Sequence, residues 1–275
     1  MKIKNLKKLY SNKFKFIKEK SAFLFREVKD LSYIFGIKLI TLLIITEIKY
    51  LKEKNLTANY QDFYFSKNMI TESTPPKYYK KNYKFDHMDS FTLNVYIWNK
   101  FFKKYKLTNK IINYLEIGSF EGRSSVYVLE NLNNAYCYFV DPFEEYEEMT
   151  KSTNQNNFSS IYNNFKINVG SFRGRYEIFK TTSDNFFENL EKTKKFDLIY
   201  IDGSHLSKDV YADAINSNKI IREGGFIIFD DFFWFWYPNL EDNPFFGISK
   251  FLYENRKKYK IIYLGDQLII RKTKT

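Results

Sequence analysis

The stretch Asn113–Leu132, NYLEIGSFEGRSSVYVLENL, decides the fold of this chain. Its apolar run over residues 114–117 predicts a buried strand, and the pattern that follows is helical. Gly118 and Gly122 allow the backbone to turn sharply beside a ligand, and a serine pair that begins at Ser124 can cap the helix. Because a helix start presents free N–H groups, this order predicts the nucleotide-binding corner of an α/β enzyme.

The two glycines of this turn are spaced G-x-x-x-G. The dinucleotide fingerprint is G-x-G-x-x-G, in which the glycines serve a tight turn and close approach to a pyrophosphate. The spacing therefore disfavours a nicotinamide or flavin cofactor, and it favours a different nucleotide-like ligand.

Apolar runs alternate with helical patterns through the rest of the chain. Strands are predicted over residues 112–117, 136–141, 176–180, 198–202 and 225–230. Helices are predicted over residues 123–132, 184–190, 208–217 and 246–256. Two last strands, 260–264 and 267–271, are joined by Gly265-Asp266, which is a hairpin signal. We therefore expect an α/β fold with a Rossmann-like, seven-stranded, mainly parallel sheet that ends in an antiparallel hairpin.

Three segments are expected along the chain. Residues 110–275 form the core, in which the polar stretch 144–168 is a helix-bearing insertion. Residues 58–109 form a flap and lid segment, because an aromatic and polar stretch broken by two prolines precedes an amphipathic helical pattern. Residues 1–57 form a basic helical extension. Residues 1–54 alone carry fourteen Lys/Arg and five Asp/Glu, and so hold +9 of the formal net charge of +12.

The basic extension indicates peripheral contact with an anionic membrane surface. Its most apolar window, Leu31–Ile48, has Lys38 near the middle, which costs about 2.5–3.5 kcal/mol in a bilayer and disfavours a transmembrane helix. Burial against the core or a second copy of the chain is favoured instead. The first twenty residues lack a signal-peptide pattern, and the single cysteine, Cys137, cannot form an intrachain disulfide, so we expect a cytoplasmic protein.

Aspartates follow the ends of predicted strands, where open parallel sheets bind their ligands. Asp141 ends the second strand, Asp202 ends a later one, and Asp230 and Asp231 end the next. If the last two strands are neighbours, about 4.8 Å apart, three carboxylates meet and repel one another. A divalent cation, Mg2+ before Mn2+ or Ca2+, resolves that repulsion. The alternative, that these aspartates are helix caps and surface carboxylates, stays open.

Two blocks of the sequence resemble a known family. LEIGSFEG, residues 115–122, resembles the first motif of class I S-adenosylmethionine-dependent methyltransferases. Residues 196–233 resemble the metal-dependent O-methyltransferases, especially the macrocin O-methyltransferase branch and more distantly catechol O-methyltransferase. The resemblance covers residues 110–272 in the family's order, and it implies S-adenosyl-L-methionine and Mg2+ as cofactors.

The resemblance also implies which residues bind the S-adenosyl-L-methionine. They are Glu116, Gly118, Gly122, Ser124, Asp141, Ser183 and Asp184. The position of Asp141 is that of the acid that accepts hydrogen bonds from the ribose hydroxyls. Ser183 and Asp184 take the adenine-contacting position, and a role as helix caps would produce the same pattern.

The resemblance assigns the metal ligands to Asp202, Asp230 and Asp231, and catechol-type enzymes have an amide at the position of Asp231. His205, three residues after Asp202, takes the place of the histidine base of the macrocin branch. A surface or capping histidine is the alternative. An unperturbed imidazole has a pKa of about 6.5 and can accept a proton at neutral pH.

We therefore expect an O-methyltransferase that acts with a divalent metal on a hydroxyl of a sugar, a glycan or a small molecule. The aromatic run 232–237 is expected to wall the acceptor pocket, or to pack as a loop or dimer contact. Nucleic acid is not the expected partner, and a homo-oligomer stays open. Two alternatives also stay open: an NAD-dependent oxidoreductase, and a catalytically silent methyltransferase-fold module that binds a membrane surface or nucleic acid.

Overall fold

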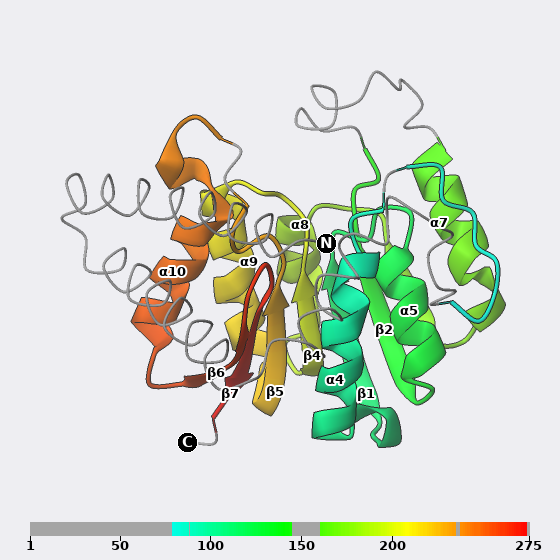
Figure 1. Cartoon of the computed structure of the whole chain (residues 1–275), viewed down its shortest axis with the longest axis horizontal. Coiled ribbons are helices and arrows are strands. Elements are labelled where there is room, and N and C mark those ends of the chain that lie inside the picture. The colour runs from blue at the N-terminus through cyan, green and yellow to red at the C-terminus, as the bar shows by residue number, and fades with distance from the viewer. Residues whose placement is uncertain (1–78, 88, 145–159, 235–236, 274–275) are drawn as a thin grey trace, which may run out of the picture.

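The computed structural model describes residues 79–87, 89–144, 160–234 and 237–273 (Figure 1). The predictions for residues 1–57, including the window Leu31–Ile48, lie outside the described residues, as does most of the flap. Among the residues that are described, no helix combines the length and apolar character needed to cross a membrane.

Seven strands form one sheet in the order β3-β2-β1-β4-β5-β7-β6. The strands are β1 (Ile112–Ile117), β2 (Ala135–Val140), β3 (Tyr176–Phe179), β4 (Phe196–Ile201), β5 (Ile221–Phe229), β6 (Tyr259–Leu264) and β7 (Leu268–Lys272). The first five pair in parallel, whereas β7 runs antiparallel to both of its neighbours. The α/β fold, the seven strands and the C-terminal hairpin are confirmed.

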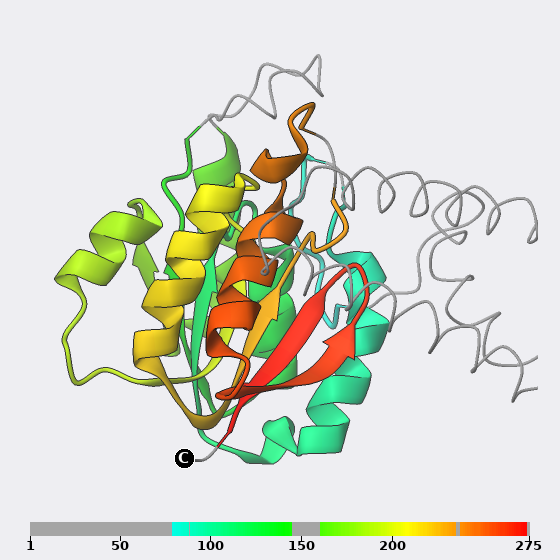
Figure 2. The same cartoon turned by 90° about the vertical axis from the view of Figure 1, so that its left-hand side faces the viewer.

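Helices cover both faces of the sheet (Figures 1 and 2). On one face lie α4 (Val95–Tyr105), α5 (Arg123–Asn131) and α7 (Ile161–Val169). On the other lie α8 (Ser183–Asn189), α9 (Ser207–Ile220) and α10 (Pro244–Asn255). Successive side chains of a strand point to opposite faces, so Leu198 and Tyr200 of β4 join the first core and Ile199 and Ile201 join the second. This double burial explains why the parallel strands read as continuous apolar runs.

The predicted strand 225–230 is the one whose bounds differ most. β5 begins four residues earlier, at Ile221, and runs through Gly224 and Gly225. The pairing of β4 with β5 shifts register between Phe196 and Leu198, and Gly224 has a φ of +76°. A glycine pair normally indicates the end of a strand, but here it accommodates a bulge within one. All other strands lie within two residues of their predicted bounds.

The chain before α4 lies across α5 and α7 and is held there by buried acids. The Glu130 carboxylate accepts hydrogen bonds from the Lys80 N–H and the Tyr83 hydroxyl. Glu121 accepts from the N–H groups of Asp86 and His87 at 3.1–3.2 Å. The described part of the predicted flap is thus tied to the core at the glycine turn, and α4 follows it as the expected helix before the core.

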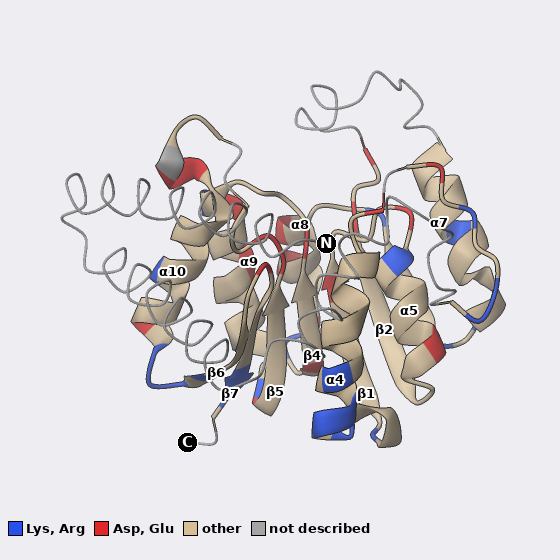
Figure 3. Ribbon diagram, in the orientation of Figure 1, with Lys and Arg blue, Asp and Glu red and all other residues tan. Residues whose placement is uncertain are grey.

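Because the strands are parallel, their carboxyl ends share one edge of the sheet, at the top of Figure 1. Acidic residues gather along this edge (Figure 3), whereas lysines mark the opposite end of α4. Three of the four non-glycine residues with positive φ in the described chain are found in the loops of this edge. They are Phe120, Phe143 and Asp231. Such conformations are uncommon and cluster at functional sites, so this edge is where a site is expected.

Candidate active site

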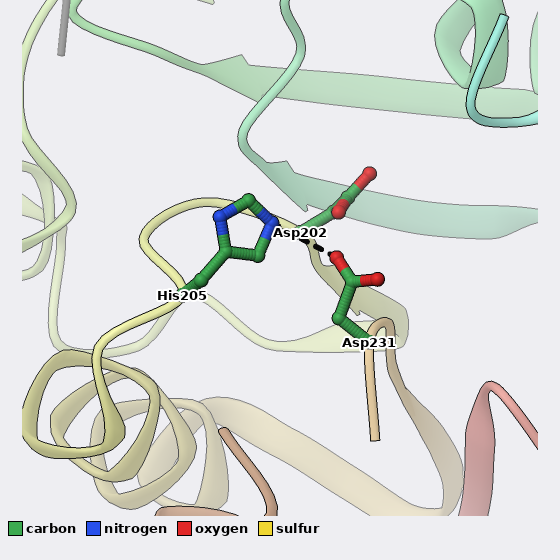
Figure 4. Close-up of side chains that lie close together, drawn as sticks. All are labelled: Asp202, His205 and Asp231. Carbon is green, nitrogen blue, oxygen red and sulfur yellow. Dashed lines mark ion pairs between the residues drawn. The ribbon is translucent and has the colours of Figure 1, made fainter. Parts of the chain in front are cut away.

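Three side chains from the ends of β4 and β5 converge at the carboxyl edge. Asp202 follows β4, His205 lies in the loop that leads into α9, and Asp231 follows β5. One ligand atom of each lies within 4.8 Å of those of the other two (Figure 4). His205 Nε2 is 2.9 Å from Asp231 Oδ2. Two carboxylates and an imidazole at this separation form a donor set suited to a divalent cation.

Asp231 reaches this cluster through an unusual backbone conformation. Its φ is +54°, in the left-handed region that aspartate tolerates better than most residues. Its N–H is bonded to Asp230 Oδ1 at 2.9 Å, and its carbonyl accepts from Trp234 N–H. The side chains of the two consecutive aspartates have different partners, since Asp231 lies at His205 and Asp230 lies at Tyr200 and Gln267.

Asp230 lies behind the cluster. Its Oδ2 accepts hydrogen bonds from the Tyr200 hydroxyl, from Gln267 Nε2 at 3.1 Å and from Asn94 Nδ2 at 3.4 Å. The Tyr200 hydroxyl also lies 2.9 Å from Asp202 Oδ2, so one phenol bridges the two carboxylates. The structure therefore brings Asp202 and Asp231 together with His205, while the predicted ligand Asp230 is held by donors from inside the fold. Its role as a ligand stays a prediction.

The ionised forms of the carboxylates at this site are destabilised by burial and by one another. Burial raises the pKa of Asp202 well above its usual range, and the charges of Asp230 and Asp231 raise it further. Burial, followed by the charge of Asp231, likewise raises the pKa of Asp230. A group of acids that resists ionisation when it is alone is stabilised in its charged form by a nearby cation. The donor set and its electrostatics both fit a divalent metal.

The glycine turn between β1 and α5 lies directly beside this cluster. A Cβ on Gly118 would come within 1.9 Å of the Asp202 carbonyl oxygen, and the φ of Gly118 is +83°. A Cβ on Gly122 would lie 2.9 Å from the Phe165 ring, again at a φ of +83°. Gly118 is therefore required by the close approach of β1 to the end of β4, which places the predicted cofactor turn next to the predicted metal site.

Glu116 and Ser124 form part of the support beneath this turn. Glu116 is fully buried and accepts hydrogen bonds from the hydroxyls of Tyr114, Ser124 and Ser125 at 2.7–2.8 Å. Burial raises its pKa to about 7, against the opposing effect of these hydroxyls. Neither serine makes a side-chain cap to the helix, whose N-cap is Gly122. The expectation of a serine cap is wrong here, because the buried carboxylate takes both hydroxyls.

Asp141 holds the same turn from the end of β2. Its Oδ2 accepts from the N–H groups of Ser119 and Phe120 at 2.8 Å, and its Oδ1 accepts from Phe143 N–H. Burial raises the pKa of Asp141, and the three backbone donors oppose that rise. The acid stands beside the glycine turn, where the ribose role was expected, and its contacts in this structure are to backbone.

Ser183 and Asp184 open α8 and are not part of the cluster of Asp202, His205 and Asp231. The helix is capped by Thr182, whose side chain accepts from Asn185 N–H. Ser183 hydrogen-bonds the buried Asp213, and Asp184 is exposed. The residue that caps the helix is therefore Thr182, and not Ser183 or Asp184. The predicted contact of these two residues with the adenine stays a prediction.

The aromatic run after Asp231 divides into core and site. Phe232 is fully buried, whereas Trp234 is partly exposed and stacks on His205 with ring centroids 4.7 Å apart and an interplanar angle of 25°. Tyr237 packs edge-on against Trp234 at 5.2 Å. Trp234 therefore orients the imidazole, and the expected place of the aromatic run in the wall of an acceptor pocket stays a prediction.

The structure adds three residues to the site: His87, which was only a weak candidate from the sequence, and Tyr200 and Gln267, which were not predicted. His87 Nδ1 lies 3.0 Å from Glu121 Oε1, and its ring packs on Phe120 in the glycine turn. Tyr200 and Gln267 contact the acids of the cluster, as described above. Only Tyr200 had a signal, since Tyr-x-Asp on a strand places both side chains on the same face.

The comparisons with known proteins agree with this geometry. Residues 115–232 match the family model described as a methyltransferase domain. The solved structure of MycE methyltransferase from the mycinamycin biosynthetic pathway, in complex with Mg, SAH and mycinamycin VI, has a TM-score of 0.50 at 14% identity, covering 68% of this chain and 51% of that one. A putative O-methyltransferase from Klebsiella pneumoniae has a TM-score of 0.50 at 13% identity, covering 84% and 97%. No curated protein matches the sequence.

The family match and the fold agree with each other. Residues 115–232 match the model of a methyltransferase domain, and the fold of the chain is similar to that of the MycE methyltransferase structure. The chain spans about half the length of the MycE structure. The resemblance read from residues 115–122 and 196–233 is thereby confirmed as a similarity, because the matching family model and the similar solved structures are those of methyltransferases.

Proposed function

We propose that this protein is an S-adenosyl-L-methionine-dependent O-methyltransferase that acts with a divalent metal on a hydroxyl of a sugar or a small molecule. The observation that carries the proposal is the contact between the two predicted sites. Gly118 packs against the carbonyl of Asp202, and Asp202 is one corner of the cluster with His205 and Asp231. A methyl donor at the turn and an acceptor at the cluster would then lie side by side.

The cofactor half of the proposal rests on the turn between β1 and α5. Backbone N–H groups and glycines at a helix start suit a nucleotide-like ligand, and the G-x-x-x-G spacing is that of a class I methyltransferase. Asp141 and His87 border the turn and would line this site. The neighbouring structure of MycE contains SAH, which supports the same ligand class here.

The metal half rests on the donor set. Asp202 and Asp231, with Asp230 as the predicted third ligand, would hold a cation such as Mg2+, since oxygen-rich sites select hard divalent ions. When bound, S-adenosyl-L-methionine supplies an electrophilic methyl group, and the cation makes an acceptor hydroxyl easier to deprotonate. The neighbouring structure of MycE also contains Mg.

His205 is proposed as the general base. Its imidazole lies at the cluster, is partly exposed, and is held by Asp231 and by the Trp234 ring. It would accept the proton of the acceptor hydroxyl, while the exposed side of Trp234 positions the acceptor. A sugar hydroxyl is the preferred acceptor, because the MycE structure holds mycinamycin VI and because a flat indole suits stacking on a sugar or an arene.

Titration calorimetry with S-adenosyl-L-methionine and with MnCl2 tests the proposal first. We expect saturable binding of both, loss of Mn2+ binding in Asp202→Ala, and transfer of a labelled methyl group to hydroxylated acceptors that stops when EDTA is added. Activity that EDTA leaves undiminished would exclude the metal mechanism. A melting temperature raised by NAD alone would favour an oxidoreductase, and binding of anionic vesicles or RNA without cofactor binding would favour a silent module.

A further inference from the structure

A line of buried polar groups runs from α4 through the C-terminal hairpin to the acidic cluster. Trp98 Nε1–H donates to Gln267 Oε1 at 2.8 Å, and Gln267 Nε2 donates to Asp230 Oδ2 at 3.1 Å. Tyr200 completes the line, since its hydroxyl contacts both Asp230 and Asp202. Trp98, Tyr200 and Gln267 are each fully buried. A buried polar group costs free energy unless it is hydrogen-bonded, and each of these three side chains has a hydrogen-bond partner.

Tyr200 has little freedom to move its hydroxyl away from the two carboxylates. Its ring packs edge-on against Trp98, with centroids 5.0 Å apart and an interplanar angle of 84°. One hydroxyl has one proton, so it can donate to only one of Asp202 and Asp230 at a time while staying in contact with both. The phenol oxygen therefore sets the separation of the two carboxylates, whichever of them receives the proton.

Gln267 is oriented by its other neighbour. The indole N–H of Trp98 is a donor only, so the atom that faces it must be the amide oxygen. The amide nitrogen is then left to face Asp230 and, at 3.5 Å, Tyr200. Without Trp98 the amide could flip and present an acceptor to a carboxylate. Trp98 thus determines that Gln267 supplies Asp230 with a donor.

We propose that Tyr200 and Gln267, with Trp98 behind them, are positioning residues for the divalent cation: Tyr200 contacts Asp202 and Asp230 together and Gln267 contacts Asp230, so they fix the spacing and orientation of these two carboxylates at the metal site. The inference rests on the proposed metal site and adds residues to it. Through this line, α4 and the β6–β7 hairpin, which are remote in sequence, both control the metal affinity. Mutation of a residue that hydrogen-bonds a metal ligand, without touching the metal itself, commonly lowers the metal affinity by about 10–100-fold.

The chain supplies a matched control. Tyr114 on β1 is also fully buried, and its hydroxyl contacts a buried carboxylate two residues on, Glu116, at 2.7 Å. Tyr114→Phe therefore also removes a buried phenol hydroxyl from a carboxylate. The carboxylate lies beneath the glycine turn and not at the metal cluster. A general loss of packing or of a buried hydrogen bond would affect both variants alike.

Mn2+ binding to the full chain, followed by calorimetry and by the electron paramagnetic resonance spectrum of bound Mn2+, tests this inference. We expect Tyr200→Phe and Gln267→Leu to weaken Mn2+ binding by about 10–100-fold and to alter the spectrum, and Trp98→Phe to weaken it less. Tyr114→Phe should keep the wild-type Mn2+ affinity and spectrum. S-adenosyl-L-methionine affinity should stay within about twofold in Tyr200→Phe and Gln267→Leu.

The two proposals fail in different ways. A wild-type chain that binds no Mn2+ overturns the metal site and this inference with it. A wild-type chain that binds Mn2+, with Tyr200→Phe and Gln267→Leu equal to it in affinity and spectrum, overturns the positioning role alone. If Tyr200→Phe does not fold, Gln267→Leu decides, because it leaves the Tyr200 hydroxyl and the Tyr200–Trp98 packing in place.

Discussion

Gly118 joins the two halves of the proposed active site at the scale of a single residue. Its Cα faces the backbone of Asp202 and Gly203, with a hypothetical Cβ 1.9 Å from one oxygen and 2.6 Å from one nitrogen. Backbone cannot move aside as a side chain can. The glycine turn and the end of β4 are therefore packed tightly against each other, and a shift of either one displaces the other.

Gly118→Ala should accordingly lower stability by more than Gly122→Ala. Both glycines have a φ of +83°, so alanine costs about 1–2 kcal/mol at either position for its conformation alone. At Gly122 the added methyl meets the Phe165 ring, which can shift, whereas at Gly118 it meets backbone. Urea unfolding of both variants gives the comparison. Equal losses would mean that the contact with β4 is not as tight as described.

Asp213 on α9 should make stability depend on pH. It is buried, its Oδ1 has no hydrogen-bond partner in the described structure, and burial raises its pKa to about 7. The folded state thus keeps a proton that the unfolded chain loses near pH 4, so stability falls as pH rises from about 4 to about 7. The full loss is about 4 kcal/mol, because raising a pKa by one pH unit corresponds to about 1.4 kcal/mol.

Asp213→Asn removes this titration. We expect the variant to match the wild type near pH 4 and to exceed it by up to about 4 kcal/mol above pH 7. Chemical denaturation at pH 4, 6 and 8 measures the difference. A constant offset at all three values would contradict the buried, protonated carboxyl.

His205→Ala tests the proposed base. The imidazole contacts Asp231 and Trp234 and stands at the edge of the cluster. Loss of a general base typically lowers the rate by about 10²–10⁴-fold, and the residual rate should rise with pH because hydroxide replaces the base. Metal and cofactor binding are measured in parallel. A His205→Ala enzyme with full rate would assign the proton to another group.

At the scale of an element, the segment 79–91 depends on acids that it does not itself contain. Glu121, fully buried in the glycine turn, accepts hydrogen bonds from the N–H groups of Asp86 and His87 and from Asn164 Nδ2. Burial opposes its ionisation, yet these donors lower its pKa overall. One carboxylate therefore connects the described part of the flap, α7 and the cofactor turn.

Glu121→Gln should loosen that segment without unfolding the core. Hydrogen bonds to a charged acceptor contribute about 1.5–3 kcal/mol, so amide exchange at Asp86 and His87 should rise by about 10–100-fold. Hydrogen exchange read by mass spectrometry measures the change. Glu188→Gln, at an exposed position of α8, is the control and should leave exchange there unaltered.

At the scale of the whole molecule, the charge is divided between two regions. Residues 1–54 hold +9 of the net +12, while acidic residues of the described core gather along the carboxyl edge of the sheet. A basic segment attracts anionic surfaces, whereas an acidic site attracts cations.

Removal of residues 1–54 should therefore separate the two functions. We expect binding to vesicles that contain phosphatidylserine to fall sharply at low salt, with S-adenosyl-L-methionine affinity within about twofold of the full chain. Vesicle sedimentation and calorimetry provide the two measurements. An equal loss of both would show that these residues are integral to the core.

The sequence by itself determined the sheet and the edge at which the site lies. Buried parallel strands are apolar on both faces, so β1, β2 and β4 could be recognised as runs, and the aspartates that follow β2 and β4 have to fall at the shared carboxyl edge. The family match of residues 115–232 agrees with that local pattern. The bounds of β5 were missed because a bulge makes use of two glycines that otherwise indicate a turn.

Only the tertiary structure decided which of the polar residues meet. His205 lies in the loop before α9 and meets Asp202 and Asp231 there, whereas Asp230 is held by Tyr200 and Gln267. The contact between Trp98 and Gln267 joins residues 169 positions apart. No local pattern specifies such a pair, since it depends on the register of β7 against β5 and on where α4 packs across the sheet.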